Sequence, residues 1–152
     1  MNVIGKKVLV LGLGDTGLSM ATWLTRHGAR VRAADSRATP PHADLLKRQL
    51  PQAEVITGGF TEECFKGIDL IAISPGVPLS EPMLESALQR GVPVVGDVEL
   101  FASALGQRKA KVIAITGANG KSTVTALCGE MCVAAGLKTV VAGNIGLPVL
   151  DA

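Results

Sequence analysis

The chain has 152 residues, a formal net charge of +2 and 47% hydrophobic residues, which fits one globular domain plus part of another. Lysine and arginine are spread along the chain and only 3% of residues are aromatic, which argues against a nucleic-acid-binding surface. No apolar run approaches the roughly 20 residues of a membrane-spanning helix. Three cysteines in no framework pattern indicate reduced thiols, so we expect a cytoplasmic protein.

The first informative stretch is a glycine-rich turn between a strand and a helix. An apolar strand is predicted over 7–11, followed at 12–17 by the pattern G-x-G-x-x-G and then by a helix over 18–27. A second strand over 31–34 ends at Asp35, whose carboxylate is placed to accept hydrogen bonds from a ribose. This context favours nucleotide binding, although the same pattern also fits a tight turn without a ligand. Arg37 beside Asp35 either faces a phosphate or is solvated.

The middle of the chain continues the alternation of strands and helices. We expect a helix over 44–50, a strand over 53–57, a helical turn over 62–65, a strand over 69–73, a helix over 81–90, a strand over 92–95 and a helix over 97–105. The strand over 69–73 runs directly into Ser74, Pro75 and Gly76, which form either a ligand-binding edge of the sheet or a rigid turn. Residues 106–109 have the composition of a linker.

A second strand, glycine loop and helix are predicted after this linker. Residues 112–115 have the β-branched content of a buried strand, and a helix is expected over 123–135, with a last strand over 139–142. Between them, Gly117 and Gly120 allow the backbone to turn its N–H groups inward, Lys121 adds a positive charge and Ser122 adds a hydroxyl. These groups suit a phosphate cradle with Mg²⁺.

The second loop departs from the common phosphate-binding loop, which has a glycine where this chain has Ile115. The simpler alternative is a glycine turn with an exposed lysine. The order of strand, loop, Lys-Ser and helix favours phosphate binding. No acid follows Lys121 in a convincing strand context to hold Mg²⁺, so we expect the chain to be a fragment of a longer protein.

Several stretches together carry a family resemblance. They are residues 12–17, 74–76, 96–101, 116–123 and 143–146. In this order they resemble the Mur ligases over the whole chain, most of all the branch that adds D-glutamate. The pattern T-G-x-N-G-K-[ST] at 116–123 is quite specific to this superfamily, and it accounts for Ile115.

The resemblance implies an α/β fold and a set of site residues. Residues 1–96 would form a Rossmann-like parallel sheet flanked by helices that binds a UDP-linked substrate, and residues 97–152 would begin a P-loop ATPase domain. The resemblance places the UDP-substrate at Asp15, Thr16, Asp35, Ser36, Arg37, Ser74, Pro75, Gly76 and Asn144. It places ATP at Gly117, Ala118, Asn119, Gly120, Lys121, Ser122 and Thr123, with Lys121 catalytic and Ser122 near Mg²⁺.

The family's reaction joins an amino acid to a carboxylate at the expense of ATP. The resemblance implies UDP-N-acetylmuramoyl-L-alanine, D-glutamate and ATP as substrates, an acyl phosphate as intermediate, and no obligate protein partner. Because the family's other metal ligands and its amino-acid-binding domain lie beyond residue 152, we expect this chain alone to be inactive. The competing hypotheses are an NAD-dependent dehydrogenase built on residues 1–96, and a nucleotide-binding module without catalysis. Neither of them uses all of the loops.

Overall fold

A computed structural model describes residues 1–106 and 110–152, and its centre is a parallel five-stranded sheet. The strands are β1 (Lys7–Leu11), β2 (Arg30–Asp35), β3 (Glu54–Thr57), β4 (Leu70–Ile73) and β5 (Val94–Val95). Their order is β3-β2-β1-β4-β5, and every neighbouring pair is parallel. The sheet order therefore changes direction between β1 and β4.

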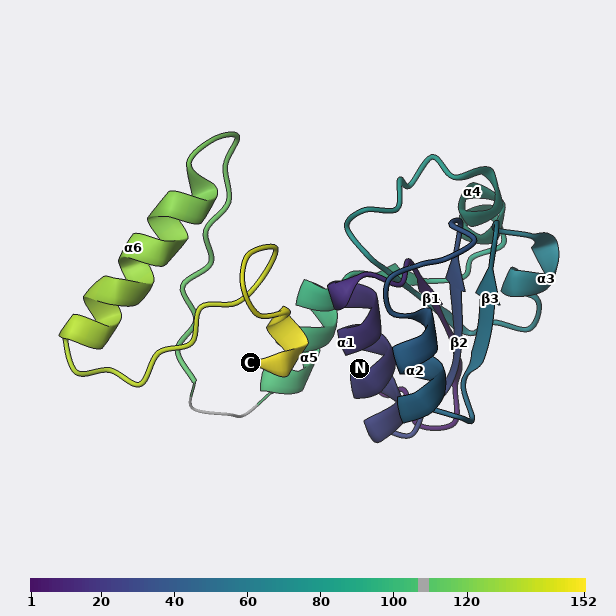
Figure 1. The fold of residues 1–152 in the computed structure, drawn as a ribbon, viewed down its shortest axis with the longest axis horizontal. Helices are drawn as coiled ribbons and strands as arrows, with labels where there is room; N and C mark the ends of the chain where they lie inside the picture. The colour runs from purple at the N-terminus through teal and green to yellow at the C-terminus, as the bar shows by residue number, and fades with distance from the viewer. Residues whose placement is uncertain (107–109) are drawn as a thin grey trace.

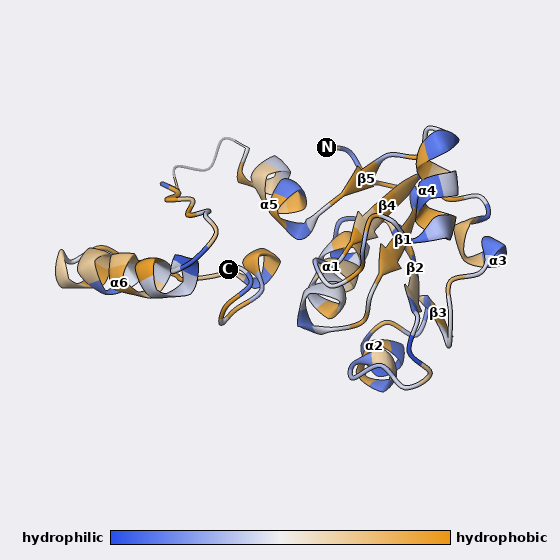
Figure 2. Cartoon of the chain, turned by 90° about the horizontal axis from the view of Figure 1, so that it is seen from above, coloured by the Kyte–Doolittle hydropathy of each residue, from blue (hydrophilic) through white to orange (hydrophobic). Residues whose placement is uncertain are grey.

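Helices cover both faces of this sheet, as Figures 1 and 2 show. They are α1 (Asp15–Arg26), α2 (Ala43–Gln49), α3 (Glu62–Phe65), α4 (Pro82–Gln89) and α5 (Asp97–Leu105). Side chains of β1 point alternately to the two faces of the sheet, so the core is divided into two clusters. Val8 and Val10 pack with α1, α2 and α5, whereas Leu9 and Leu11 pack with α3 and α4. Both faces are aliphatic, as a parallel sheet buried on two sides requires.

The predicted α/β fold is confirmed in its coarse form by this sheet. All the strands and helices expected up to residue 105 are present, with ends that shift by a few residues. The largest shift is at α1, which begins at Asp15 and not at residue 18. Asp15 carries its negative charge in the first helical turn, where the helix dipole favours it. Of the expected linker, residues 107–109 lie outside the described residues.

Arg32 on β2 ties the short helix α3 to the sheet. Its Nε donates a hydrogen bond to Glu54 Oε2 at 2.6 Å. Its Nη1 donates to three carbonyl oxygens at the end of α3, those of Glu63 at 2.9 Å, Cys64 at 3.1 Å and Lys66 at 3.2 Å. One guanidinium thus satisfies carbonyls that a helix end leaves unpaired.

We expect Arg32→Met to lower the free energy of unfolding by about 2 kcal/mol, because the carbonyl oxygens at the end of α3 lose a charged donor. Arg30→Met removes an exposed arginine from the same strand and is the matched control, expected to change stability by less than about 0.5 kcal/mol. Urea unfolding followed by the fluorescence of Trp23 measures both. An Arg32→Met curve that overlays the wild-type curve would contradict this role.

The strands predicted after the linker are absent, so this part of the sequence prediction is wrong. Residues 112–115 have no regular structure, and the side chain of Ile113 is 64% exposed. Residues 139–142 contain only an isolated bridge between Ala142 and Leu147. Two short strands and one helix offer too few neighbours to satisfy their backbones and cover their apolar side chains. Most of the apolar residues on which the prediction rested are therefore exposed.

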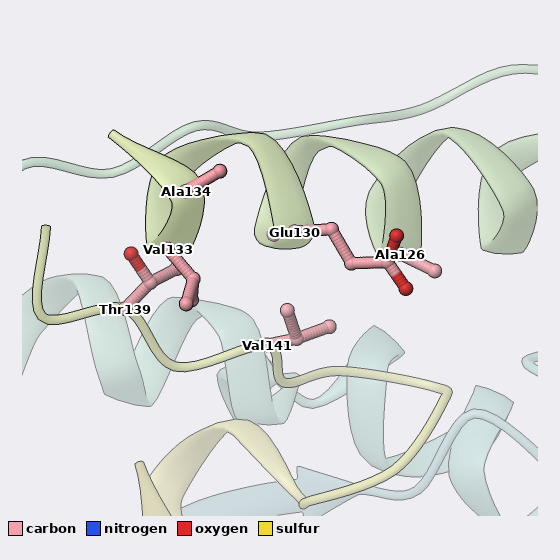
Figure 3. A pocket seen from close by; sticks show the side chains of 7 residues that line it. Ala126, Glu130, Val133, Ala134, Thr139 and Val141 are labelled. Carbon is pink, nitrogen blue, oxygen red and sulfur yellow. The ribbon is translucent and has the colours of Figure 1, made fainter. Parts of the chain in front are cut away.

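The helix of this second unit, α6 (Lys121–Ala134), does form, and it lies apart from the sheet in Figure 1. One face of α6 meets residues 139–141 across an apolar hollow, where Val141 points toward the helix in Figure 3. Gly129 is the buried residue of this face, and a Cβ placed on it would lie 2.4 Å from Val141 Cγ2. The last element is the 3-10 helix η1 (Val149–Asp151). Within the described parts of the chain, no helix is long and apolar enough to cross a membrane.

Candidate functional site

The candidate site lies at the carboxyl edge of the sheet, where β1 and β4 end side by side. Leu11 and Ile73, their last residues, are paired in register. The loop at 12–17 follows β1, and Ser74 follows β4. Ser74 donates its backbone N–H to the Leu11 carbonyl at 2.9 Å and its Oγ–H to the Gly12 carbonyl at 3.2 Å. The two predicted loops are thus joined at the point where open α/β sheets bind ligands.

Neighbouring atoms approach two positions of this loop so closely that only glycine fits there. Gly12 has a φ of +89°, and a Cβ there would lie 3.1 Å from both Ser74 Cβ and Val77 Cγ2. Gly17, in the first turn of α1, faces the Gly12 carbonyl so closely that a Cβ would lie 1.8 Å from that oxygen. Removing both side chains lets α1 begin directly against the loop. The helix N-terminus is thereby brought to the edge of the sheet.

Asp35 holds this loop to the end of β2 and is only 2% exposed. Its Oδ2 accepts hydrogen bonds from the Leu13 backbone N–H at 2.7 Å and from Arg37 Nη2 at 2.6 Å. Its Oδ1 accepts from the Arg37 backbone N–H at 2.9 Å and from Arg37 Nε at 2.8 Å. Chiefly because of the Arg37 side chain, the pKa of Asp35 falls from its ordinary value of 3.8 to about 2, although burial opposes this change.

Arg37 is therefore paired with Asp35, and not merely solvated. Its side chain is 54% exposed, so the far side of the guanidinium faces solvent at the rim of the site. Pairing with Asp35 raises the pKa of Arg37 above its ordinary value, which keeps it charged. Ser36, Pro75 and Gly76 are exposed at the same edge, and Thr16 is half-buried in the first turn of α1. The structure thus gathers the site residues predicted within 1–96 at one edge of the sheet.

His42, just before α2, is a neighbour of this site that the sequence analysis did not single out. Its Nε2 lies 2.6 Å from Oδ1 of Asp15, whose side chain is exposed at the start of α1. His42 precedes α2 whereas Asp15 begins α1, so no local pattern in the sequence indicates the pair. His42 places an ionisable ring beside the helix N-terminus at which the loop opens.

The second predicted loop has the expected turn, although the strand before it is absent. Gly117 has a φ of +154° and Gly120 a φ of +73°, and α6 begins at Lys121. Lys121 Nζ donates to the carbonyl oxygens of Gly117 at 2.6 Å and Ala118 at 3.3 Å, so the lysine folds back over its own loop. Ser122 and Thr123 are exposed in the first helical turn. Backbone amides, a lysine and two hydroxyls thus gather at one helix N-terminus, an arrangement that suits phosphate.

The structure does not bring the two glycine loops together. In Figure 1, α5 and the C-terminal segment lie between α6 and the sheet. Asn144 is exposed in the turn between Ala142 and Leu147. Among the described residues, no side-chain hydrogen bond links Asn144 to either loop. The site at the edge of the sheet is therefore assembled, whereas the loop at 117–123 lies apart from it.

The chain is similar to known proteins over its full length. A model of the family described as Mur ligase MurD-like, N-terminal domain, matches residues 6–96. A UDP-N-acetylmuramoylalanine--D-glutamate ligase from Methylobacillus flagellatus is 64% identical over 96% of this chain, and one from Thiobacillus denitrificans is 58% identical over all of it. The chain covers 32% and 35% of these proteins, so it spans about a third of their length.

Solved structures give the same assignment at the level of the fold. A pseudomurein peptide ligase type C from Methanothermus fervidus matches with a TM-score of 0.57 and 25% identity over 87% of this chain and 27% of that protein. A UDP-N-acetylmuramate-alanine ligase from Thermotoga maritima also has a TM-score of 0.57, with 22% identity over 84% of this chain and 29% of that protein. Since the family model matches well over half of the chain, and covers the assembled glycine loop, this chain belongs to the Mur ligases, in the family of MurD-like N-terminal domains.

Proposed function

We propose that this chain is the N-terminal part of an ATP-dependent ligase that joins D-glutamate to UDP-N-acetylmuramoyl-L-alanine in the cytoplasm. The observation that carries the proposal is the glycine loop at the change of strand order, closed by Ser74 and held by Asp35. The names of the relatives support the choice of substrates. The division into a substrate domain over 1–96 and the start of an ATP-binding domain over 97–152 is part of the same proposal.

In the first domain, the assembled edge of the sheet would hold the uridine diphosphate. Asp15 and Thr16 lie in the first turn of α1, where backbone N–H groups and the helix dipole favour the diphosphate. Ser36 and Arg37 would face the uridine, with the exposed side of Arg37 toward the ligand. Asp35 would take part by holding Arg37 in place from behind. Ser74, Pro75 and Gly76 would close the other side. Asn144 would contact the substrate between the two domains.

In the second unit, residues 117–123 would cradle ATP. Lys121 would exchange its carbonyl partners at Gly117 and Ala118 for the terminal phosphates of ATP. Mg²⁺ would take the hydroxyl of Ser122, one hard oxygen ligand that suits this ion together with phosphate oxygens. Within the residues that the structure describes, no group of three acidic, histidine or cysteine side chains could hold a metal. The fit is thus to one ligand of a site whose other ligands come from ATP and from elsewhere.

The chemistry needs such a cradle because a carboxylate is a poor electrophile. Transfer of the terminal phosphoryl group of ATP to the substrate carboxylate gives an acyl phosphate and ADP. The amino group of D-glutamate then attacks the acyl carbon, and phosphate leaves as the amide forms. Lys121 would offset the negative charge on the transferred group, and Mg²⁺ supplies further positive charge there.

The dehydrogenase hypothesis is weakened by the position of Asp35. In a dinucleotide-binding fold the acid at the end of the second strand accepts a hydrogen bond from the ribose hydroxyl. Here both carboxylate oxygens already accept hydrogen bonds from Leu13 and Arg37. A nucleotide-binding module without catalysis would need one glycine loop and not both.

Calorimetric titration tests the proposal with two ligands, UDP-N-acetylmuramoyl-L-alanine and NADH. We expect the uridine compound to bind and NADH to give no heat. Arg37→Met should weaken binding of the uridine compound at least about tenfold, because the ligand loses its exposed cation. Arg48→Met, which removes an exposed arginine from α2, is the control and should bind as the wild type does. Binding of NADH alone would contradict the proposal.

A further inference from the structure

The C-terminal segment returns to the first domain and packs on it. In Figure 1 this segment, in yellow, lies against α5 and beside α1. Val149 is buried there, and Leu150 packs against the core that α1, α2 and α5 share. Together with Trp23 and Phe101 these residues line a hollow between the two helices. The apolar side chains of Val149 and Leu150 thus seat η1 on the surface formed by α1 and α5.

A hydrogen bond between the two ends of the chain secures this seat. Ser19 lies on α1, one turn after Asp15, and is only 4% exposed. Its Oγ donates to Oδ1 of Asp151 at 2.8 Å, across 132 positions of sequence. A buried hydroxyl without a partner is costly, so this contact favours one position of η1 on α1.

The seated segment is joined to Asn144 by a short, constrained connection. The bridge between Ala142 and Leu147 closes the turn that carries Asn144, and the Gly143 N–H donates to the Leu147 carbonyl at 2.9 Å. Pro148 then restricts the backbone just before η1. An anchor at 149–151 therefore limits where Asn144 can lie.

We propose that Ser19 and Asp151 are positioning residues that hold Asn144 toward a substrate bound at the N-terminus of α1. This inference rests on the proposed function and adds to it a role for η1. The anchor and the diphosphate site share one rigid element, because Asp15, Thr16 and Ser19 all belong to the first turns of α1. A shift of η1 along α1 would move Asn144 relative to the sugar and peptide end of the substrate, and leave the uridine diphosphate contacts intact.

The fluorescence of Trp23 reports whether η1 is seated, because Trp23 is the one tryptophan in a chain that has no tyrosine. We expect Val149→Asp to raise the acrylamide quenching of Trp23 about twofold, because η1 leaves the hollow and opens it to solvent. Val98→Asp makes the same change at an exposed position of α5 and should leave the quenching as it is. Equal quenching in Val149→Asp and wild type would overturn the seating, whether or not any ligand binds.

The positioning role is tested by measuring the affinities for two ligands, UDP and UDP-N-acetylmuramoyl-L-alanine. We expect Ser19→Ala and Asp151→Ala each to weaken binding of the full substrate about fivefold. The affinity for UDP should stay unchanged, because only the full substrate reaches Asn144. Asp151→Asn keeps an acceptor oxygen at Oδ1 and should restore most of the affinity. Ser86→Ala, which removes a serine hydroxyl from α4 that accepts from Arg90, is the control.

A double-mutant cycle separates positioning from general damage. If the anchor acts through Asn144, the variant with both Asn144→Ala and Asp151→Ala binds the full substrate no more weakly than Asn144→Ala alone. Additive losses, or an equal loss of UDP affinity, would overturn the positioning role. If the wild type binds neither ligand, the proposed function fails and the positioning role fails with it. If the wild type binds the full substrate and Asp151→Ala binds equally well, only the positioning role fails.

Discussion

Gly17→Ala is expected to lower the free energy of unfolding by about 3 kcal/mol or more, because the new Cβ has no room. It would lie 1.8 Å from the Gly12 oxygen, 2.8 Å from the Gly12 carbonyl carbon and 3.2 Å from Ser74 Oγ. The first two atoms belong to backbone, so no side-chain rotation relieves the clash. Either α1 must move away from the sheet or the Gly12 carbonyl must turn. A turned carbonyl would also lose the hydrogen bond from Ser74.

The matched control is Gly14→Ala in the same loop. Gly14 precedes α1 with an extended backbone, φ −84° and ψ −168°, and a Cβ there would meet nothing within 4 Å. We expect this variant to lose less than about 1 kcal/mol, the cost of alanine at a helix N-cap. Urea unfolding, followed by Trp23 fluorescence, compares the two. Equal stability of Gly17→Ala and Gly14→Ala would contradict the tight approach of α1 to the loop.

The contrast between these glycines shows how far the sequence alone can go. The pattern at 12–17 predicts a glycine turn between β1 and α1, because local backbone constraints and apolar periodicity determine such a turn. Most of the structure up to residue 105 follows from signals of this kind, and β1, α3 and α5 have the expected limits. Which glycine meets a carbonyl oxygen depends on the packing of α1 on the sheet. The sequence pattern assigns close packing of helix on strand to its third glycine, Gly17, but it does not indicate which atom that glycine meets.

The failures of the sequence prediction share one physical cause, which is dependence on distant partners. Residues 112–115 have a strand composition, but β-branched residues form a strand only where neighbouring strands accept their hydrogen bonds. The pair of His42 with Asp15, and that of Ser19 with Asp151, join segments that no local pattern connects. For Asp35 the sequence indicates a place at the end of β2. It does not show that Leu13 and Arg37 take both carboxylate oxygens.

Asp35→Asn tests this arrangement and should lower the free energy of unfolding by about 2 kcal/mol near neutral pH, because a neutral amide cannot accept from all of these donors. In the wild type, the pKa of Asp35 is lowered in the folded state to about 2, from an ordinary value of 3.8. The stabilisation is thus fully present above pH 4 and is lost as the pH falls toward 2. Across that window the stability of the wild type should approach that of Asp35→Asn.

The measurement is urea unfolding of both proteins at intervals between pH 2 and pH 6. Asp44→Asn, which removes an exposed carboxylate from the first turn of α2, controls for the loss of one negative charge. If the difference in the free energy of unfolding between wild type and Asp35→Asn stays constant down to pH 2, Arg37 does not hold the carboxylate ionised. If this difference disappears as the pH falls, one buried charge joins the glycine loop, through Leu13, to the arginine at the rim. Protonation of Asp35 would then release both sides of the proposed uridine site together.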